Sequence, residues 1–238
     1  MKKSKQVYQK RYSIKDQPIA SIILIAVNVF VFIYLFTRAN GNANKYYEYL
    51  YNHWAVVSPK IREGQLYRLI TAIFIHFDVK HLSNNMAALY VSGMFLEKKE
   101  SKHKLIFIFL LSGIFGNVTS FAFNNQFSGG ASGAIFGLIA ALSAEILQSV
   151  FENGNQNLKE SLKYVGIALL LPVIYIIPGI FIVRVNNIAH ISGAVVGIVG
   201  SFVFDKDNYK YKAQLKFLGS GTIILSFVIM LGKGLLLS

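Results

Sequence analysis

The sequence contains no cysteine, and few of its residues carry charge. The absence of cysteine excludes disulfides, thiol catalysis and thiolate metal sites, and it leaves the redox compartment open. Only 15% of the 238 residues are charged, whereas 54% are hydrophobic, and the mean hydropathy is +0.47. This composition is too apolar for an ordinary soluble domain. We therefore expect an integral membrane protein that lies in a lipid bilayer.

Acidic residues are also scarce, with 11 Asp and Glu against 24 Lys and Arg, which gives a formal net charge of +13. Such an excess occurs in nucleic-acid-binding proteins as well. Here, however, the basic residues form short clusters between apolar runs, where membrane topology rules place them. We therefore expect no nucleic-acid partner.

Seven apolar runs are each long enough to cross a bilayer, at residues 18–37, 79–96, 105–123, 132–150, 162–183, 188–204 and 215–237. The connections leave no room for a separate soluble domain, so we expect an all-α, polytopic helical bundle. The first run has the length of a full span and no small-x-small cleavage site follows it, so we expect a retained span and not a signal peptide.

The distribution of basic residues predicts the orientation of the bundle. Alternate connections hold six, four, two and four of the 24 Lys and Arg residues: 1–17, 97–104, 151–163 and 205–216. The other eight are spread over a much longer length of chain. The positive-inside rule then places the N terminus in the cytoplasm and the C terminus outside. Ser132, at the start of the fourth span, is expected on the outer side of a cell membrane.

Three other segments carry local signals. The connection 38–78 is rich in aromatic residues and includes the apolar stretch Trp54-Ala55-Val56-Val57, which favours an anchoring belt at the membrane interface. The uncharged, glycine-ending segment 124–131 is expected to dip inward and bring water to Ser132. In the fifth span, Pro172 and Pro178 predict a kinked, movable helix that moves away from the second span to admit substrate.

Ser132 is either a packing residue or a nucleophile, and a serine nucleophile needs a base within hydrogen-bond reach. Among the five histidines, His76, His81 and His190 are expected at the outer ends of the second and sixth spans. His190 is the strongest candidate, because an ionisable side chain inside an apolar span is by default a functional hypothesis.

Small residues recur every four positions beside both candidates, and such faces let two helices approach closely. They are Gly133, Gly137 and Ala141 beside Ser132, and Ala189, Gly193, Gly197 and Ser201 beside His190. The acidic residues nearest in sequence, Glu145 and Asp205, belong to the cytoplasmic ends of their spans. The pattern therefore supports a Ser-His dyad and not a triad.

Two further groups of side chains fit acyl transfer. Phe136, one helical turn after Ser132, is either a core aromatic or a ring that orients the imidazole. His81 and Asn85, spaced i and i+4, point the same way and, with the Ser132 N–H, make three donors for an oxyanion. A metal site at His76 and His81 is the weaker alternative, because their spacing separates them around a helix. We expect no metal.

Together, Gly130-Ala131-Ser132-Gly133, Ala189-His190 followed by Gly193 and Gly197, and His81-x-x-x-Asn85 resemble the rhomboid family of intramembrane serine proteases. The likeness runs over residues 18–205, the six-span core. It includes Tyr67-Arg68, where the family usually has Trp-Arg, and Phe136, where many members have tyrosine. The resemblance thus implies a catalytic core at 18–205 with the long loop 38–78. Outside this shared core, charge and hydropathy predict a basic tail at 1–17 and a linker with a seventh span at 206–238.

The resemblance implies a serine endopeptidase that cleaves single-span membrane proteins near the outer end of their helix, with no cofactor. Ser132 would be the nucleophile, His190 the base and then the acid, and His81, Asn85 and the Ser132 N–H the oxyanion donors. Structural support would come from seven residues: Arg68, Gly130, Gly133, Phe136, Gly137, Gly193 and Gly197. The alternatives are a non-catalytic relative that binds transmembrane clients and, less well supported, a transporter. A transporter needs polar groups through the whole bundle, whereas here we expect them in the outer half alone.

Overall fold

The computed structural model describes residues 17–99, 101–123, 127–152, 186–203 and 210–236, and the single positions 166 and 170. Throughout these residues the regular structure is helical, and the predicted all-α membrane bundle is confirmed. Apart from two positions, the predicted fifth span at 162–183, with Pro172 and Pro178, lies outside the described residues. Its kink and its movement therefore stay predictions.

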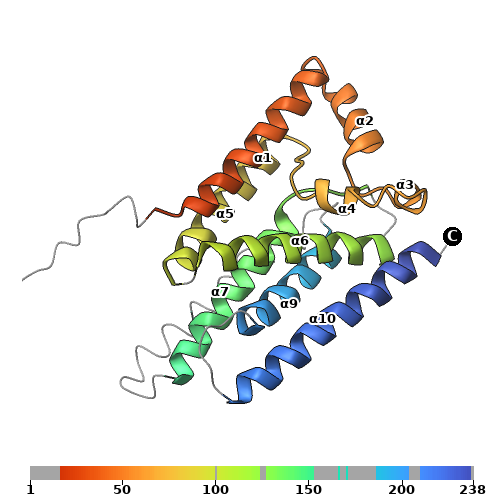
Figure 1. Cartoon of the computed structure of the whole chain (residues 1–238). Helices are drawn as coiled ribbons and strands as arrows, with labels where there is room; N and C mark the ends of the chain where they lie inside the picture. The colour runs from red at the N-terminus through yellow and green to blue at the C-terminus, as the bar shows by residue number, and fades with distance from the viewer. Residues whose placement is uncertain are drawn as a thin grey trace, which may run out of the picture.

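Six long helices make up the described part of the bundle (Figure 1): α1 (Ile19–Arg38), α5 (Val79–Lys99), α6 (Lys102–Phe123), α7 (Ser132–Glu152), α9 (Asn187–Val203) and α10 (Lys210–Leu236). The stretches Ile19–Arg38, Lys102–Phe123 and Phe217–Leu236 are long and apolar enough to cross a membrane. Ser132–Gln148 and Asn187–Val203 are shorter apolar helices. All six begin and end within a few residues of a predicted span.

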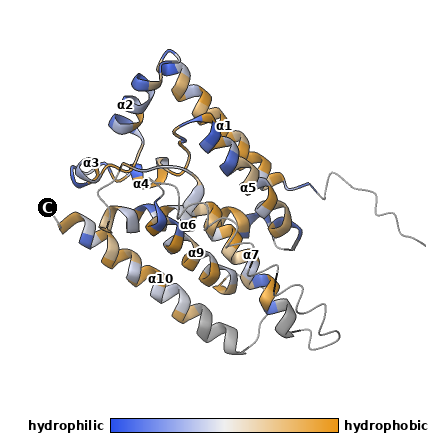
Figure 2. Cartoon of the chain, turned by 180° about the vertical axis from the view of Figure 1, so that it is seen from behind, coloured by the Kyte–Doolittle hydropathy of each residue, from blue (hydrophilic) through white to orange (hydrophobic). Residues whose placement is uncertain are grey.

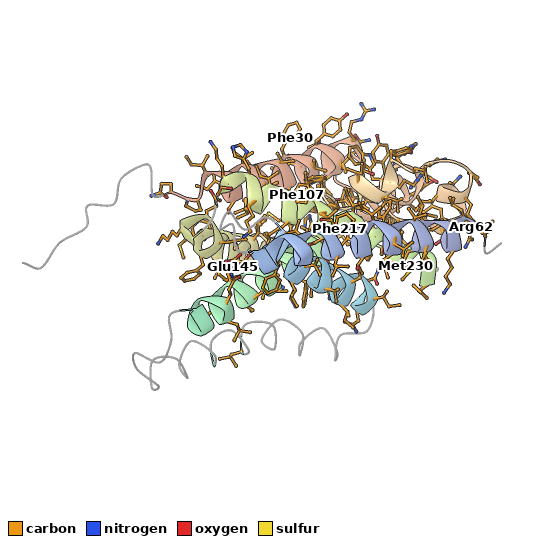
Figure 3. All side chains as sticks on the ribbon, turned by 60° about the horizontal axis from the view of Figure 1, so that its bottom comes forward. Phe30, Arg62, Phe107, Glu145, Phe217 and Met230 are labelled. Carbon is orange, nitrogen blue, oxygen red and sulfur yellow. The ribbon has the colours of Figure 1, made fainter. Side chains whose placement is uncertain are left out.

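The helices pack around α6, which Figure 1 shows running through the middle of the molecule. α7 packs against α9, α6 contacts both, and α10 lies along α6 and α9, while α1 packs against α5 and α5 against α7. Figure 2 shows hydrophobic residues along α1, α6 and α10, and hydrophilic residues gathered over α2 and α3. Apolar side chains such as Phe217, labelled on α10 in Figure 3 and 81% exposed, suit a lipid environment.

The connection between α1 and α5 folds into three short helices that composition did not predict: α2 (Ala43–His53), α3 (Ser58–Arg62) and α4 (Arg68–Thr71). Arg68 is fully buried beneath them, and its guanidinium donates to the carbonyl oxygens of Tyr51, Asn52 and Ala55. These carbonyls lie at and just beyond the end of α2, where a helix has no partners of its own for them. Arg68 thus holds the connection together.

The expectation of a membrane-facing belt is wrong for the apolar stretch after Trp54. Ala55, Val56 and Val57 are buried inside the protein, and Val56 packs in one cluster with Phe121. The Val56 N–H donates to the Ser128 carbonyl (2.9 Å), and the Ser128 N–H donates back (3.2 Å). Pairing with another segment satisfies the backbone polar groups and so permits their burial.

We expected polar groups in the outer half of the bundle alone, and this expectation is wrong. Polar groups also occur at the end of the bundle opposite Ser132. At the opposite end, the Glu97 carboxylate accepts hydrogen bonds from the backbone N–H groups of Ala20 and Ser21 at the start of α1. Lys104 of α6 pairs with Glu145 of α7 at 2.6 Å, with side chains 3% and 6% exposed. Each buried charge has a partner, as burial in an apolar medium requires.

Candidate active site

Ser132 is the first residue of α7, and its hydroxyl meets the imidazole of His190 on α9. The distance from Ser132 Oγ to His190 Nε2 is 2.7 Å, which is the length of a good hydrogen bond. Because Ser132 begins its helix, its N–H has no acceptor within α7 and remains available to a ligand. A hydroxyl, an imidazole and an N–H without an acceptor in its own helix thus lie together at one helix start.

Phe136 stacks on the His190 ring. The two rings stack with centroids 4.3 Å apart and planes 13° apart, and Phe136 is itself buried. It lies one turn after Ser132 on the same helix, so one face of α7 carries both the hydroxyl and the ring that supports its partner. Phe136 was expected to be either a core aromatic or a ring that orients the imidazole, and the ring contact agrees with the second alternative.

Glycines allow α7 and α9 to approach until their backbones touch. A Cβ added at Gly193 or Gly197 would collide with the carbonyl oxygen of Gly133 or Gly137, respectively. In return, a Cβ at Gly133 would lie 3.3 Å from the Ala189 carbonyl oxygen. No rotamer change relieves a clash with backbone, so Gly193 and Gly197 require glycine, whereas the contact at Gly133 is only tight. The close approach brings His190 within reach of Ser132.

His81 and Asn85 on α5 lie beside Gly130, two residues before Ser132. A Cβ at Gly130 would be 2.8 Å from His81 Cε1, 3.0 Å from His81 Nε2 and 3.8 Å from Asn85 Nδ2. Gly130 also has a φ of +130°, a backbone conformation that L side chains rarely adopt. Glycine at this position therefore leaves the space next to both side chains open.

One contact of His81 favours a proton on Nε2 over one on Nδ1. The Phe77 N–H points at His81 Nδ1 at 3.5 Å, a long contact, and the Phe77 ring stacks on the imidazole at 5.8 Å between centroids. With Nδ1 as acceptor, the neutral ring carries its proton on Nε2, the nitrogen next to Gly130. The second donor, Asn85 Nδ2, is buried and has no hydrogen-bond partner in the part of the chain that the structure describes. Both groups can thus donate into the space beside Gly130.

His76, which the sequence offered as a metal ligand with His81, is fully buried in the connection and meets the His81 ring edge-on, with centroids 5.0 Å apart. Desolvation, and to a lesser degree the neighbouring His81, lowers the pKa of His76 to about 3. His76 is therefore neutral at physiological pH and places no positive charge beside the donors. Tyr46 donates its hydroxyl to the His76 carbonyl at 2.7 Å and so fixes this corner.

The loop in front of Ser132 is held by backbone hydrogen bonds that the sequence did not predict. Gly130 N–H donates to the Ala72 carbonyl at 2.8 Å, and Ser128 pairs with Val56. Composition alone carries no signal for these bonds, because they are made by backbone atoms. Backbone bonds within the protein thus satisfy Ser128 and Gly130. Residues 124–126 lie outside the described residues, and an inward-dipping loop that brings water to Ser132 stays a prediction.

Comparison with known proteins agrees with this constellation. Residues 63–206 match the Rhomboid domain family. The rhomboid protease GluP of Bacillus subtilis is 36% identical over 142 residues, which cover 60% of this chain and 26% of that protein. RHOMBOID-like protein 1 of Arabidopsis thaliana is 32% identical over 150 residues, 62% of this chain and 37% of that protein.

The chain is also similar to a relative that is named as inactive. Human inactive rhomboid protein 1 is 29% identical over 187 residues, 72% of this chain and 21% of that protein. The chain thus spans well under half the length of these relatives, and their names include both a protease and an inactive protein. The domain match extends over more than half of the sequence and includes Ser132 and His190. The chain belongs to the rhomboid family.

Proposed function

We propose that the protein is a serine endopeptidase that hydrolyses peptide bonds of membrane proteins with a Ser132-His190 dyad. The observation that carries the proposal is the hydrogen bond of 2.7 Å between Ser132 Oγ and His190 Nε2. A serine hydroxyl is a poor nucleophile by itself, and a base at hydrogen-bond distance is what activates it.

In the first half of the reaction, Ser132 Oγ attacks the substrate carbonyl carbon while its proton passes to His190 Nε2. The tetrahedral intermediate collapses, the C–N bond breaks, and the leaving amine takes the proton from His190. In the second half, His190 removes a proton from water, which attacks the acyl ester. The C–O bond to Ser132 then breaks, and His190 returns the proton to Ser132 Oγ as the new carboxylic acid leaves. Phe136 keeps the imidazole aligned through both halves of the reaction. In a catalytic triad, a carboxylate has this role.

The negative charge that develops on the substrate oxygen needs donors already in place. His81 Nε2, Asn85 Nδ2 and the Ser132 N–H are assigned this role, because the first two lie beside Gly130 and Ser132 follows Gly130 by two residues. In a site with little water, preorganised donors of this kind stabilise an oxyanion strongly.

The resemblance to the family implies that the substrates are single-span membrane proteins. The predicted topology, with a cytoplasmic N terminus, an outer C terminus and Ser132 toward the outer face of a cell membrane, places the cleaved bond near the outer end of their helix. A peptide bond in a helix is shielded and has to unwind before Ser132 can reach it, so helix-weakening sequences are the expected cleavage sites.

The competing function is a non-catalytic protein that binds transmembrane clients, and the similarity to an inactive rhomboid protein keeps it under consideration. A fluorophosphonate probe distinguishes the two, since it reacts with an activated serine. We expect the wild-type protein and Ser143→Ala to be labelled and Ser132→Ala not to be, as read by in-gel fluorescence of the purified protein in detergent. Ser143 is a matched control because it is a second buried serine on α7.

Equal labelling of Ser132→Ala, or no labelling of the wild type under conditions where it remains folded, would favour the non-catalytic function. If only Ser132→Ala loses the label, while the wild type and Ser143→Ala keep it, the result supports an activated Ser132.

The oxyanion assignment makes its own prediction. Asn85→Ala is expected to lower kcat for a single-span substrate about 100-fold with little change in KM, because one donor to the transition state is lost. Asn84→Ala is the control, since Asn84 is the neighbouring asparagine on α5 and is exposed. Steady-state cleavage in detergent micelles measures both constants. A kcat for Asn85→Ala within a factor of two of the Asn84→Ala value would contradict the assignment.

A further inference from the structure

Three polar side chains outside the dyad link the segment that carries His190 to the segment that carries Ser132. Asn186 precedes His190 by four residues, and Ser128 precedes Ser132 by four. Between them, on α6, is Ser120, which is fully buried. Asn186 Nδ2 donates to Ser120 Oγ at 2.5 Å, and Ser120 Oγ lies 3.4 Å from Ser128 Oγ. No sequence motif marked any of the three.

Asn186 also determines where α9 begins. Its side-chain Oδ1 accepts the Ala189 N–H at 3.2 Å, the arrangement of an N-cap residue, and its carbonyl accepts the His190 N–H at 3.2 Å. One asparagine therefore uses its amide oxygen to start the helix and its amide NH₂ to bind α6. Because Asn186 already donates to Ser120, the Ser120 hydroxyl proton is free to be donated to Ser128.

The contact between α7 and α9 needs such a link. Two glycine faces let the helices touch, but they have few side chains that interlock, so they resist sliding along the helix axis less than a ridged contact does. A slide of α9 by about 1 Å is enough to spoil the alignment of reacting groups. Directional hydrogen bonds from Asn186 through buried Ser120 to Ser128 oppose that slide.

We infer that Asn186, Ser120 and Ser128 form a positioning link that sets the depth of His190 relative to Ser132. None of the three touches substrate, so they act through the dyad. The expected effect of this link on catalysis rests on the proposed protease function. Ser128 completes the link because it is also paired with Val56, which anchors the loop to the connection.

The test separates the link from the helix cap. Asn186→Ser keeps an N-cap oxygen but lacks the amide that reaches Ser120, and Ser120→Ala removes the acceptor. Each is expected to lower kcat for a single-span substrate about tenfold with KM nearly unchanged, because bound substrate meets a misaligned dyad. The double variant is expected to lose no more than either single one, since both break the same link. Thr119→Val is the control, because the Thr119 hydroxyl donates to the Phe115 carbonyl within its own helix and has no other partner among the residues that the structure describes.

A second measurement does not depend on activity. Hydrogen exchange of the intact protein in micelles, followed by mass spectrometry, is expected to speed up at residues 127–131 in Asn186→Ser and Ser120→Ala but not in Thr119→Val. Unchanged exchange, wild-type kcat in Asn186→Ser, or losses in kcat that multiply in the double variant would overturn the link. A wild type without any Ser132-dependent label would instead count against the proposed function, and exchange would still decide whether the link exists.

Discussion

Ser132→Ala and His190→Ala are each expected to reduce cleavage of a single-span membrane protein by about 10⁴-fold or more. The two side chains act as one unit, because the hydroxyl attacks only as its proton passes to His190 Nε2, which lies 2.7 Å away. Removing one member leaves the other without its partner. The double variant is therefore expected to be no less active than either single variant.

Matched controls come from the same chain. Ser143→Ala removes another buried hydroxyl from α7, and His103→Ala removes an exposed imidazole from the first turn of α6. Both are expected to cleave like the wild type. The cleavage reaction is carried out in liposomes, and the product is measured by gel electrophoresis. Thermal unfolding verifies that every variant is folded. Cleavage by a folded Ser132→Ala variant at more than a few per cent of the wild-type rate would exclude Ser132 as the nucleophile.

Gly197→Ala is expected to lower the free energy of unfolding by about 3 kcal/mol, although it adds a single methyl group. The new Cβ would overlap the Gly137 carbonyl oxygen, and backbone cannot rotate out of the way. α7 and α9 then have to separate, which also moves His190 away from Ser132. We expect cleavage to fall together with stability, in contrast to the dyad variants, which remain stable.

The control is the same substitution where space is open. A Cβ at Gly221 of α10 meets nothing within 4 Å, so Gly221→Ala is expected to stabilise its helix slightly, by about 0.5–1 kcal/mol. Denaturation by SDS in mixed micelles, followed by circular dichroism, measures both changes. If Gly197→Ala were as stable as the wild type, the backbone contact between α7 and α9 would not be as close as described.

Composition and periodicity predicted much of the fold. Apolar runs long enough to cross a bilayer are a local property, and the described helices start and stop close to the predicted spans: α1 at Ile19–Arg38 against 18–37, and α7 at Ser132–Glu152 against 132–150. The recurrence of small residues every four positions predicted the contact between α7 and α9, because helical geometry alone places such residues on one face.

The site residues were predicted from their functional groups and from their expected depth in the membrane. A histidine in an apolar span and a serine between glycines are rare enough to be singled out, and the structure brings Ser132, His190 and Phe136 together. What the sequence could not supply is the distance between the reacting atoms. That distance depends on how two helices from distant parts of the chain pack.

The connection between α1 and α5 shows the limit most clearly. Ala55, Val56 and Val57 are apolar, and apolar side chains suit either the membrane interface or the protein interior. Burial was decided by backbone bonds between Val56 and Ser128, which lie far apart in sequence. The charged pair of Lys104 and Glu145 is similar, since neither residue carries a signal for its partner.

The sequence by itself thus determined the membrane class, the six long helices that the structure describes, the family and the residues able to carry chemistry, because hydropathy, helical period and functional groups are properties of short stretches of chain. Only the tertiary structure decided which polar groups meet: Arg68 with the end of α2, Asn186 with Ser120, and Ser132 with His190. The physical reason is that hydrogen bonds depend on distances of a few tenths of an ångström between segments whose relative positions no local pattern specifies.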